Sequence, residues 1–389
     1  SKAHCSLRVT FLKQSEGWQQ IIHTQPQYYY TSTMIEHHQQ NALQIQLCNM
    51  LQEIQKSLNI TEGPLMAVTH VQADAHYLIL VIHHLVTDVV SWHIIVDQLS
   101  QRLSSNCSSL TTFDSDDQAY THACQNPPTL YKMDEDILEN STPPSMFFEK
   151  SGSEASAMKQ SRQLDTSLLR SLGTMLIAQT GLDLEAMFVT ILHYALSDTL
   201  QTQCHLIHLE HHGRDLYDAD INQCTGWFTS LLPVLLQQQG QPHVLYDIFR
   251  TAKAIKNASS ILAPDNSKHP ALILFNYLGK LSLQPSARVT VLPIENSVDR
   301  SPDNHRCYAI ECNLFYIDDS LTMQWVYSEN GPCSSFCQKL IRAFEHHYIT
   351  VVQKLHCILQ NWVGQRLQAC GPMHIMMLQQ LEYSQQSLS

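Results

Sequence analysis

The sequence lacks the features that mark nucleic-acid-binding and membrane-spanning proteins. Its 389 residues contain 23 basic and 35 acidic side chains, a net charge of −12, and no basic cluster offsets the acidic excess. Such a balance disfavours non-specific binding to nucleic acid or to anionic lipid. No apolar run approaches the ~20 residues that a bilayer-spanning helix needs. We therefore expect neither a nucleic-acid partner nor a membrane partner.

The sequence also lacks the marks of secretion and of metal binding. Its first residues, SKAHCSLRVTFLKQ, contain no basic region followed by an apolar core, so they predict no secretory signal. The 12 cysteines lack the paired spacing of metal sites, and the closest two, Cys333 and Cys337, have no second pair near them. Reduced thiols in the cytoplasm are the expected state, and no metal site is expected.

Glycine is scarce, with 12 residues in the chain. We find no glycine-rich phosphate loop, no nucleophile elbow, no dinucleotide fingerprint and no His-Glu-x-x-His motif. No internal repeat of solenoid length appears either. The usual sequence signatures of nucleotide-binding enzymes, α/β hydrolases and zinc proteases are therefore absent.

What the chain does have is a core-forming composition. Hydrophobic residues make up 44% and charged residues 15%, which is typical of a globular protein. The length is too great for one ordinary core and suits two lobes. Residues 104–163 are rich in Ser, Asp, Thr and Pro, and we interpret them as a long connection with little regular structure. The predicted lobes are residues 1–163 and 164–389.

Hydrophobic periodicity predicts a mixed α/β protein. Apolar residues at helical spacing predict a set of helices, over 33–58, from Ser91 onward, and over 167–181, 183–200, 243–256 and 334–360. Short apolar runs bounded by turn residues predict strands within 65–82 (a hairpin turning at 72–75), 205–212, 225–236 and 271–279, and a pair within 307–330 joined at Asp318 and Asp319.

The segment HHLVTDVVSW, residues 83–92, places His83 and His84 between a predicted strand and a predicted helix. Catalytic groups commonly lie on such loops, and a neutral histidine is suited to moving protons at neutral pH. Adjacent residues of a strand point to opposite faces, so one imidazole can enter a cleft while the other packs behind it. Asp88 or Ser91 can cap the helix. The alternative is two polar residues at a strand end, satisfied by the backbone.

Three further segments carry candidate residues. In LEHHGRDL, Glu210 follows an apolar strand and Arg214 can organise carboxylates, although a solvated charged loop is the commoner case for a glutamate at a strand end. His208 and His212 have the four-residue spacing of metal ligands on a helix, but this segment is predicted as a strand. In TGWFTSLLPV, Trp227 is part of an aromatic wall or of the core. In FNYLG, Asn276 lies inside an apolar strand, so it must be hydrogen-bonded or functional.

Taken together, these four segments resemble successive motifs of the epimerization domains of nonribosomal peptide synthetases. Those domains belong to the condensation-domain superfamily and have the chloramphenicol-acetyltransferase-like fold. The His-His-x-x-x-Asp motif suits any condensation-type domain, whereas Gly-Trp-Phe-Thr and Asn-Tyr-Leu-Gly favour epimerization over peptide-bond formation. The resemblance covers nearly the whole chain. It implies an α/β fold of two lobes with a channel between them.

The resemblance also implies a reaction and its residues. His84 from the first lobe and Glu210 from the second would invert the α-carbon of an aminoacyl or peptidyl thioester carried on the 4'-phosphopantetheine of an upstream peptidyl carrier domain. Asp88 would hold its loop through an arginine or through backbone amides. The supporting and channel residues would be His83, Arg214, Trp227, Asn276 and Tyr277. The domain itself would bind no metal and no other cofactor, and a downstream condensation domain would be a further partner.

Two alternatives to epimerization stay open. A condensation domain would use His84 to assist amine attack on the thioester and would not need Glu210. A catalytically inactive domain would only dock carrier domains. Glu210→Gln separates epimerization from condensation, because only epimerization needs the carboxylate. Deuterium exchange at the α-carbon of a loaded carrier substrate separates epimerization from an inactive domain.

The sequence departs from the family pattern at four places. Val89 follows Asp88 where the family has glycine, and if that position has positive φ, a β-branched residue there costs about 1–3 kcal/mol. His211 stands for a glycine beside Glu210. The family's opening motif and first strand are missing, so the chain is expected to be N-terminally incomplete. ASSILAPDNSKH, residues 258–269, replaces a glycine-rich segment before FNYLG.

Overall fold

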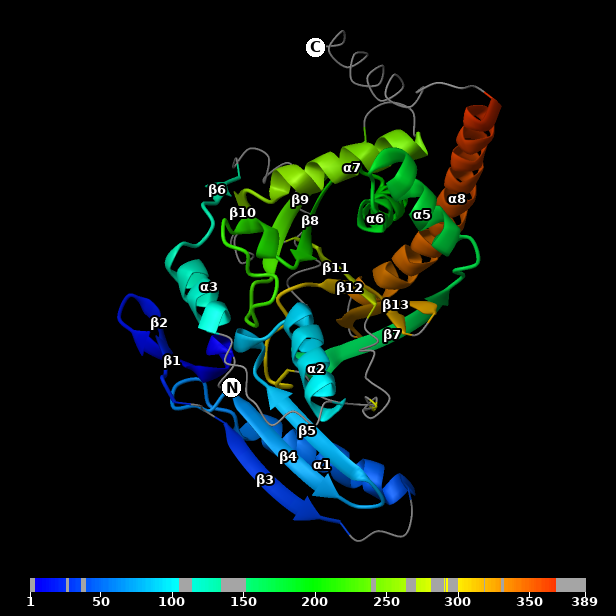
Figure 1. Cartoon of the computed structure of the whole chain (residues 1–389). Helices are drawn as coiled ribbons and strands as arrows, with labels where there is room; N and C mark the ends of the chain where they lie inside the picture. Colours follow the sequence, from blue (N-terminus) through cyan, green and yellow to red (C-terminus); the bar gives the residue numbers. More distant parts are fainter. Residues whose placement is uncertain are drawn as a thin grey trace. The chain divides into compact units, whose positions relative to one another are not determined.

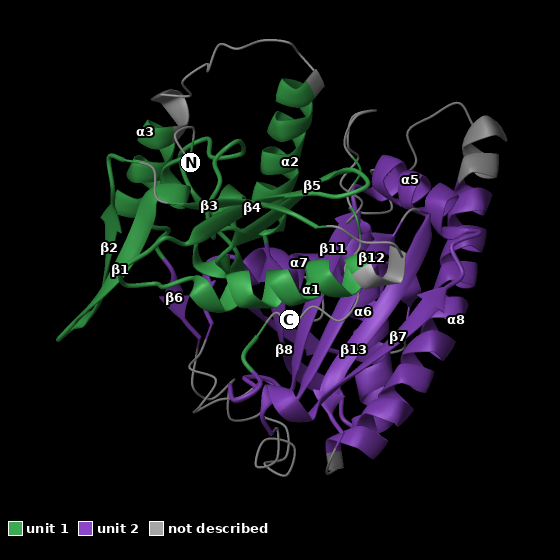
Figure 2. Cartoon of the chain, turned by 90° about the horizontal axis from the view of Figure 1, so that it is seen from below, with its two compact units in different colours: residues 1–129, 212–230, 283–301 green, residues 130–211, 231–282, 302–389 purple. Residues whose placement is uncertain are grey.

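The computed structural model of the chain is shown in Figure 1. It describes residues 4–25, 28–35, 40–104, 114–133, 152–238, 243–263, 271–280, 290, 292, 300–317, 319–329 and 332–368. The chain divides into two compact units, drawn in two colours in Figure 2: residues 1–129, 212–230 and 283–301 form unit 1, and residues 130–211, 231–282 and 302–389 form unit 2. This division places 130–163 in unit 2 and 212–230 in unit 1, whereas the predicted lobes meet at residue 163.

Unit 1 contains a small mixed sheet covered by one helix. Strand β3 (Tyr29–Met34) runs parallel to β4 (Met66–Gln72), and β4 pairs antiparallel with β5 (His76–Ile82). Helix α1 (Gln40–Ser57) packs its Leu43 and Leu47 onto one face, against alternate strand residues such as Val71 and Ile79. The hairpin predicted within 65–82 is confirmed. The helix predicted to begin at residue 33 begins at Gln40, because the β-prone segment Tyr29–Met34 continues as a strand.

A second core of unit 1 lies beside the first and includes elements that the sequence did not reveal. It joins strand β1 (Val9–Gln14), which forms a hairpin with β2 (Gly17–Ile22), to the short 3₁₀ helix η1 (Cys5–Arg8), α2 (Val89–Ser104) and α3 (Asp114–Gln125). Helix α3 lies in the segment predicted to have little regular structure, so that prediction was wrong there. Helix α3 is mostly polar and has only a narrow buried face. On that face Tyr120 and Ala123, three residues apart, pack with Cys5 and Leu7.

Unit 2 is built on a six-stranded sheet in the order β7-β13-β12-β11-β8-β9. Strand β11 runs parallel to both β8 and β12, while β12, β13 and β7 are antiparallel neighbours. The strands are β7 (Ala157–Leu164), β8 (Cys204–His211), β9 (Ser230–Gln237), β11 (Ile273–Lys280), β12 (Ile310–Ile317) and β13 (Ser320–Ser328). Strand β7 and the short strand β6 (Tyr131–Lys132), which pairs with β10 (Ile261–Leu262), also lie in the segment predicted to be irregular.

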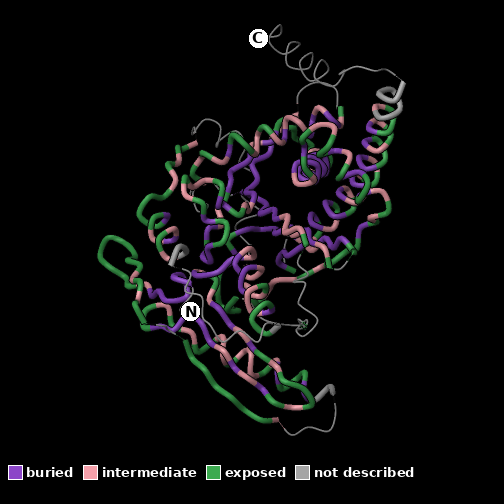
Figure 3. The backbone as a smooth tube through the Cα atoms, in the orientation of Figure 1, coloured by how far each residue is buried: buried purple, intermediate pink, exposed green. Residues whose placement is uncertain are grey.

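Helices of unit 2 pack against this sheet to form the largest core cluster of the described residues. They are α5 (Leu169–Thr180), α6 (Leu184–Leu200), α7 (Val244–Ala258) and α8 (Pro332–Gln368). Helix α6 is apolar on nearly every side and is buried from Ala186 to Leu196, as Figure 3 shows. Asp183 caps it by accepting a hydrogen bond from the Ala186 backbone N–H (2.9 Å). All four helices were predicted to within a turn of their ends, apart from the longer C-terminus of α8.

The strand predictions for unit 2 are confirmed with one correction. The predicted strand 225–236 begins only at Ser230, because the preceding residues form a loop that belongs to unit 1. Asp318, at the predicted joint of β12 and β13, and residues 264–269 of the departing segment lie outside the described residues. Within the described ranges, no individual helix combines the length and the apolar composition that a bilayer crossing requires, and α5 with α6 meet that requirement only as a pair bent by 106°.

Truncation of the α6 core should be strongly destabilising. Phe188 is fully buried and its ring lies 5.2 Å from that of Tyr277. We expect Phe188→Ala to lower the free energy of unfolding by about 3–5 kcal/mol, measured by urea denaturation. Ile177→Ala, at a position 58% exposed on α5, is the matched control and should change it by less than about 0.5 kcal/mol. Equal losses in the two variants would contradict this assignment of the core.

Buried histidines should make unit 2 sensitive to acid. Burial lowers the pKa of His193 to about 3, with the nearby His205 adding to the effect, and burial lowers the pKa of His205 to about 4. The unfolded chain binds these protons below the ordinary histidine pKa of about 6.5, while the folded chain resists them until much lower pH. The contribution of these neutral histidines to the free energy of unfolding is therefore fully present above pH ~6.5 and is lost as the pH drops toward 4.

The expected loss is at most about 1.4 kcal/mol per pH unit for each such histidine. Urea denaturation at pH 7, 6 and 5 measures it. His193→Leu should make the dependence on pH shallower, whereas His122→Gln, at an exposed position on α3, should leave it unchanged. A dependence that is the same in His193→Leu as in the native chain would refute the role of this histidine.

Candidate functional site

The two adjacent histidines follow strand β5 rather than belonging to it. β5 ends at Ile82, and His84–Val86 form a single 3₁₀ turn that His83 caps by accepting a hydrogen bond from the Leu85 backbone N–H (3.1 Å). The prediction that strand alternation points the two imidazoles to opposite faces was therefore wrong, because neither histidine lies on the strand. His83 is nevertheless half-buried and His84 exposed. Burial, with a smaller contribution from His84, lowers the pKa of His83 and keeps it neutral.

Asp88 is the capping residue of α2. Its Oδ1 accepts hydrogen bonds from the backbone N–H of Ser91 (2.8 Å) and from the Ser91 hydroxyl (2.7 Å). Val89 is the first helical residue, and among the described residues Gln201 is the one non-glycine with positive φ. The strain expected at Val89 is therefore absent, because the first turn of a helix accepts a β-branched residue with ordinary backbone angles.

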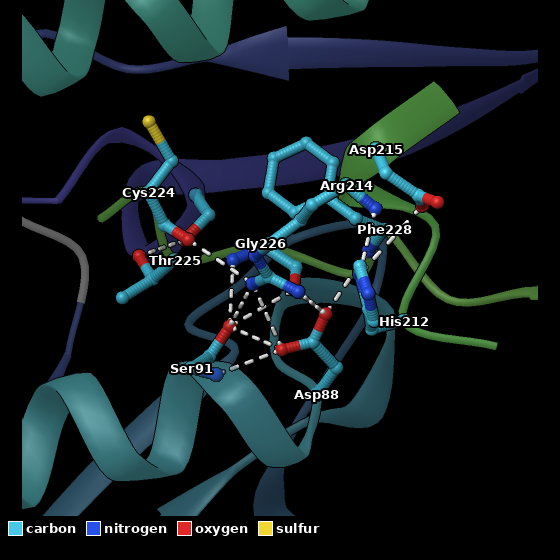
Figure 4. A network of polar contacts seen from close by, with 10 residues as sticks. Asp88, Ser91, His212, Arg214, Asp215, Cys224, Thr225, Gly226 and Phe228 are labelled. Atoms are coloured by element: carbon cyan, nitrogen blue, oxygen red, sulfur yellow. Dashed lines mark hydrogen bonds and ion pairs between the residues drawn. The ribbon is translucent and has the colours of Figure 1, made fainter. Parts of the chain in front are cut away.

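A buried ion pair joins Asp88 to Arg214, as Figure 4 shows. Arg214 Nη1 donates to Asp88 Oδ2 (2.7 Å) and Nη2 to Oδ1 (3.0 Å), and the two side chains are 2% and 3% exposed. The Phe228 backbone N–H donates to Asp88 Oδ2 (3.3 Å), and the guanidinium lies 4.8 Å from the centre of the Phe228 ring. Asp88 thus has both kinds of partner that the sequence predicted, an arginine and backbone amides.

The same network holds the loop that carries Trp227. The Ser91 hydroxyl lies 3.0 Å from both the N and the O of Gly226, and Arg214 Nη2 donates to the Cys224 carbonyl (3.1 Å). Gly226 has φ +156°, and a Cβ there would approach the rings of Phe228 and Tyr120 within 2.8 and 2.9 Å. Only glycine suits this close approach.

The sequence predicted only part of what Gly213, Gly226 and Ser91 do in this site. Gly213 has φ +68°, and a Cβ there would lie 2.0 Å from the Phe228 carbonyl oxygen. Ser91 was considered as a helix cap, but its wider role in binding Gly226 was missed. The sequence signal for Ser91 was its position three residues after Asp88, because the N–H at that position of a helix usually donates to the side chain that caps the helix.

The aromatic pair of this loop separates into a core residue and a surface residue. Phe228 is buried and packs with Tyr120 and Tyr217 at ring distances of 6.0 and 5.6 Å. Trp227 is 51% exposed and meets the exposed His84 ring edge-on at 5.9 Å. The network beneath therefore brings one exposed aromatic ring and one exposed imidazole together on the surface of unit 1.

A second group of candidate residues lies in unit 2 on the face of the sheet away from the helices. The register of β8 and β11 sets Asn276 opposite Glu210, and Asn276 Nδ2 donates to Glu210 Oε2 (2.8 Å). Asn276 is 9% exposed, so the sequence prediction of a hydrogen-bonded amide inside an apolar strand is confirmed. Tyr277 points the other way and packs on Phe188, where burial raises its pKa. The structure does not bring it beside Glu210.

His208 shares the strand face of Glu210, two residues away on β8. Its Nδ1 lies 2.8 Å from the Tyr308 hydroxyl, and burial lowers its pKa to about 4. Burial raises the pKa of Tyr308, and the Cys307 thiol and the Glu210 carboxylate raise it further. His212 is exposed and accepts the Arg214 backbone N–H (3.1 Å). His208 and His212 would share a metal ion only if they lay one turn apart on a helix. β8 extends through His211, so His208 lies on a strand and this spacing does not occur.

The comparison with protein families identifies the fold. A family model described as the condensation domain matches residues 2–122 and 135–361. The chain belongs to the condensation-domain family. The α/β fold class predicted from the resemblance is confirmed by this match and by the solved condensation-superfamily structures that the chain resembles.

Several relatives of this condensation-domain chain are known. It is 25% identical to a linear gramicidin synthase of Brevibacillus parabrevis over 90% of its own length and 5% of that protein. It is similar to the epimerization domain from the third module of tyrocidine synthetase B (TM-score 0.70, 20% identity, 91% and 87% of the two chains). It also resembles the condensation domain of the monacolin K polyketide synthase MokA (TM-score 0.60, 12% identity, 92% and 87%). The chain spans 4–6% of the length of the first curated relatives it matches.

Loss of either partner of the buried ion pair should destabilise unit 1. Arg214→Met leaves the Asp88 carboxylate buried without its cation, so we expect the free energy of unfolding to fall by about 3–5 kcal/mol. Urea denaturation, followed by tryptophan fluorescence, measures it. Arg170→Met is the control, because its pair with Asp319 (2.9 Å) is 78% exposed on both sides and should contribute less than about 1 kcal/mol. A loss below 1 kcal/mol in Arg214→Met would rule out the proposed dependence.

Proposed function

We propose that this condensation-domain chain epimerizes the α-carbon of an aminoacyl or peptidyl thioester, from L to D, in nonribosomal peptide synthesis. The substrate is carried on the 4'-phosphopantetheine of an upstream peptidyl carrier domain, and the domain needs no bound cofactor of its own. The observation that carries the proposal is the Glu210 carboxylate, oriented by Asn276 at the end of β8. Peptide-bond formation has no use for a carboxylate there. The similarity to a tyrocidine synthetase epimerization domain supports the same choice.

The chemistry requires two groups that act on opposite faces of one carbon. A thioester acidifies its α-hydrogen, because the electron pair left by the proton delocalises onto the carbonyl oxygen as an enolate. Glu210 takes the α-proton, the C–H electrons form the enolate, and a proton returned to the other face gives the inverted centre. His84 either donates a hydrogen bond to the enolate oxygen or serves as the opposing acid and base. The proposal requires the two units to present His84 and Glu210 to the same α-carbon.

The remaining site residues act by positioning. Asn276 donates to one carboxylate oxygen of Glu210 and so orients the base. Asp88 and Arg214 are almost wholly buried, so they cannot touch the substrate and instead hold the loop on which Trp227 meets His84. His83 supports the turn that presents His84. Trp227 is the exposed aromatic surface that an aminoacyl side chain or the pantetheine arm would contact.

Deuterium wash-in at the α-carbon tests the proposal directly. The native synthetase that contains this chain, loaded with an aminoacyl group on its carrier domain, should exchange the α-hydrogen with solvent deuterium. Glu210→Gln should slow the exchange about 10²–10⁴-fold, because the amide cannot accept the proton. Glu329→Gln, at an exposed position after β13, is the matched control and should exchange at the native rate.

Each other outcome identifies a different function. Condensation is the second candidate, favoured by the His-His-x-x-x-Asp motif and by the similarity to a condensation domain. Peptide-bond formation that survives in Glu210→Gln, without α-exchange in the native synthetase, would establish it. The absence of both exchange and bond formation in the native synthetase would leave a docking domain.

The setting of the reaction follows from the substrate. A thioester-loaded carrier domain works inside a synthetase in the cytoplasm, where thiols are kept reduced. A downstream condensation domain that accepts the inverted aminoacyl or peptidyl group is the expected consumer of the product.

A further inference from the structure

The face of the unit 1 sheet that α1 leaves uncovered carries an arrangement of polar side chains that the proposed reaction does not use. Residues alternate between the faces, so Val71 and Ile79 pack on α1 while His70 and His76 lie on the other face. The register sets Ser32 of β3 beside His70 of β4. The three side chains therefore form a row across neighbouring strands at the end of the β4–β5 hairpin.

Hydrogen bonds connect this row. Ser32 Oγ lies 3.1 Å from His70 Nδ1, and His70 Nε2 lies 3.0 Å from His76 Nδ1. The two ring planes are nearly parallel, at 14°, with centroids 5.2 Å apart. A hydrogen bond between two imidazoles requires that a lone pair of one ring points at the N–H of the other. Two ring nitrogens thus face the same small gap, which one proton occupies in the absence of a metal.

We propose that His70 and His76 bind a divalent transition-metal ion, with copper(II) preferred, in place of that shared proton. A metal with bonds of about 2.0–2.1 Å to two imidazole nitrogens at right angles holds them about 2.8–3.0 Å apart. The observed separation of 3.0 Å lies at the upper end of that range. The metal would lie beside the line between the two nitrogens, and each exposed ring would turn to point its lone pair at the ion. Tetragonal copper(II) or nickel(II) accepts such a right-angled pair, and copper(II) binds nitrogen ligands most strongly among the divalent first-row metals.

The neighbours of the two histidines suit this role. Metal-binding histidines almost always donate their second ring N–H to a nearby acceptor, and the Ser32 hydroxyl is placed to accept from His70 Nδ1. That bond leaves His70 Nε2 with its lone pair toward His76. On binding, His76 changes tautomer: the Nδ1 proton is lost to solvent and Nε2 takes up one from solvent, so the ring stays neutral and its Nδ1 lone pair binds the metal. Gln72 lies opposite His76 in the hairpin register, and solvent water supplies oxygen ligands for the other positions.

The site has a predictable effect on the fold. Its two ligands come from the two strands of one hairpin and are six residues apart, so the folded sheet holds them together whereas the unfolded chain does so only transiently. A metal that binds the folded form alone stabilises it by mass action. The ion would therefore fasten the β4–β5 hairpin, which leads directly into the turn that carries His84.

Titration of the folded chain with copper(II) chloride, after alkylation of its free thiols so that they cannot reduce the ion, tests the proposal. Binding is followed by electron paramagnetic resonance and by thermal unfolding. The expected result is one site with two equatorial nitrogen ligands and a raised midpoint of unfolding. His70→Ala and His76→Ala should each weaken the binding at this site at least about tenfold, because a single imidazole remains. His122→Ala removes an exposed histidine from α3 of the same unit and is the matched control, with unchanged binding at this site.

Ser32→Ala separates metal binding from a purely structural effect. It keeps both ligands and should lower copper affinity about tenfold while the midpoint of unfolding without metal stays within the range of a surface substitution. Circular dichroism of each variant establishes that the sheet has formed. Copper affinity that is equal in the native chain, His70→Ala and His76→Ala would overturn the proposal, as would a bound spectrum with one nitrogen ligand.

Discussion

The buried pair between Asp88 and Arg214 is the interaction on which the unit 1 site depends. It joins positions 126 residues apart in the chain, and both side chains are almost free of solvent. Neither charge could be buried alone, since an isolated buried ion is costly to desolvate. The pair therefore determines the start of α2 and the course of the 225–228 loop together. The surface meeting of His84 and Trp227 follows from those two constraints.

Strand alternation plays the corresponding part in unit 2. Odd-numbered residues of β8 and β11, such as Leu209 and Phe275, pack into the helical core, so Glu210 and Asn276 must lie on the opposite face. The pairing register then places amide against carboxylate without any loop geometry. The proposed base thus rests on rigid strands, whereas the proposed imidazole rests on a short turn secured from behind by an ion pair.

Much of the fold was readable from periodicity, because α6 and β11 bury continuous or alternating apolar residues. The helix α3 was not, because two buried residues among polar neighbours give too weak a periodic signal. The partner of Asp88 was predicted as a type of residue, yet its identity as Arg214 depends on a contact across the chain that no local pattern reveals. Strain at Val89 was expected only if its φ were positive, and the residue is instead the first of α2. Tyr277, placed in the channel by the resemblance, packs on Phe188, which a family motif alone does not reveal.

Unit 1 is assembled from separate stretches of the chain, and this has a consequence for its biogenesis. Residues 212–230 supply Arg214 to the buried ion pair, and Ile221, Cys224 and Phe228 to a core whose other buried described members lie before residue 130. During synthesis the ribosome produces residues 130–211 of unit 2 before the missing part of unit 1 emerges. Domains generally fold as units in the order of their synthesis. Unit 1 is the first to be synthesised, yet its core stays incomplete until residues 212–230 have been made. Until then Asp88 has no Arg214 to pair with and stays hydrated.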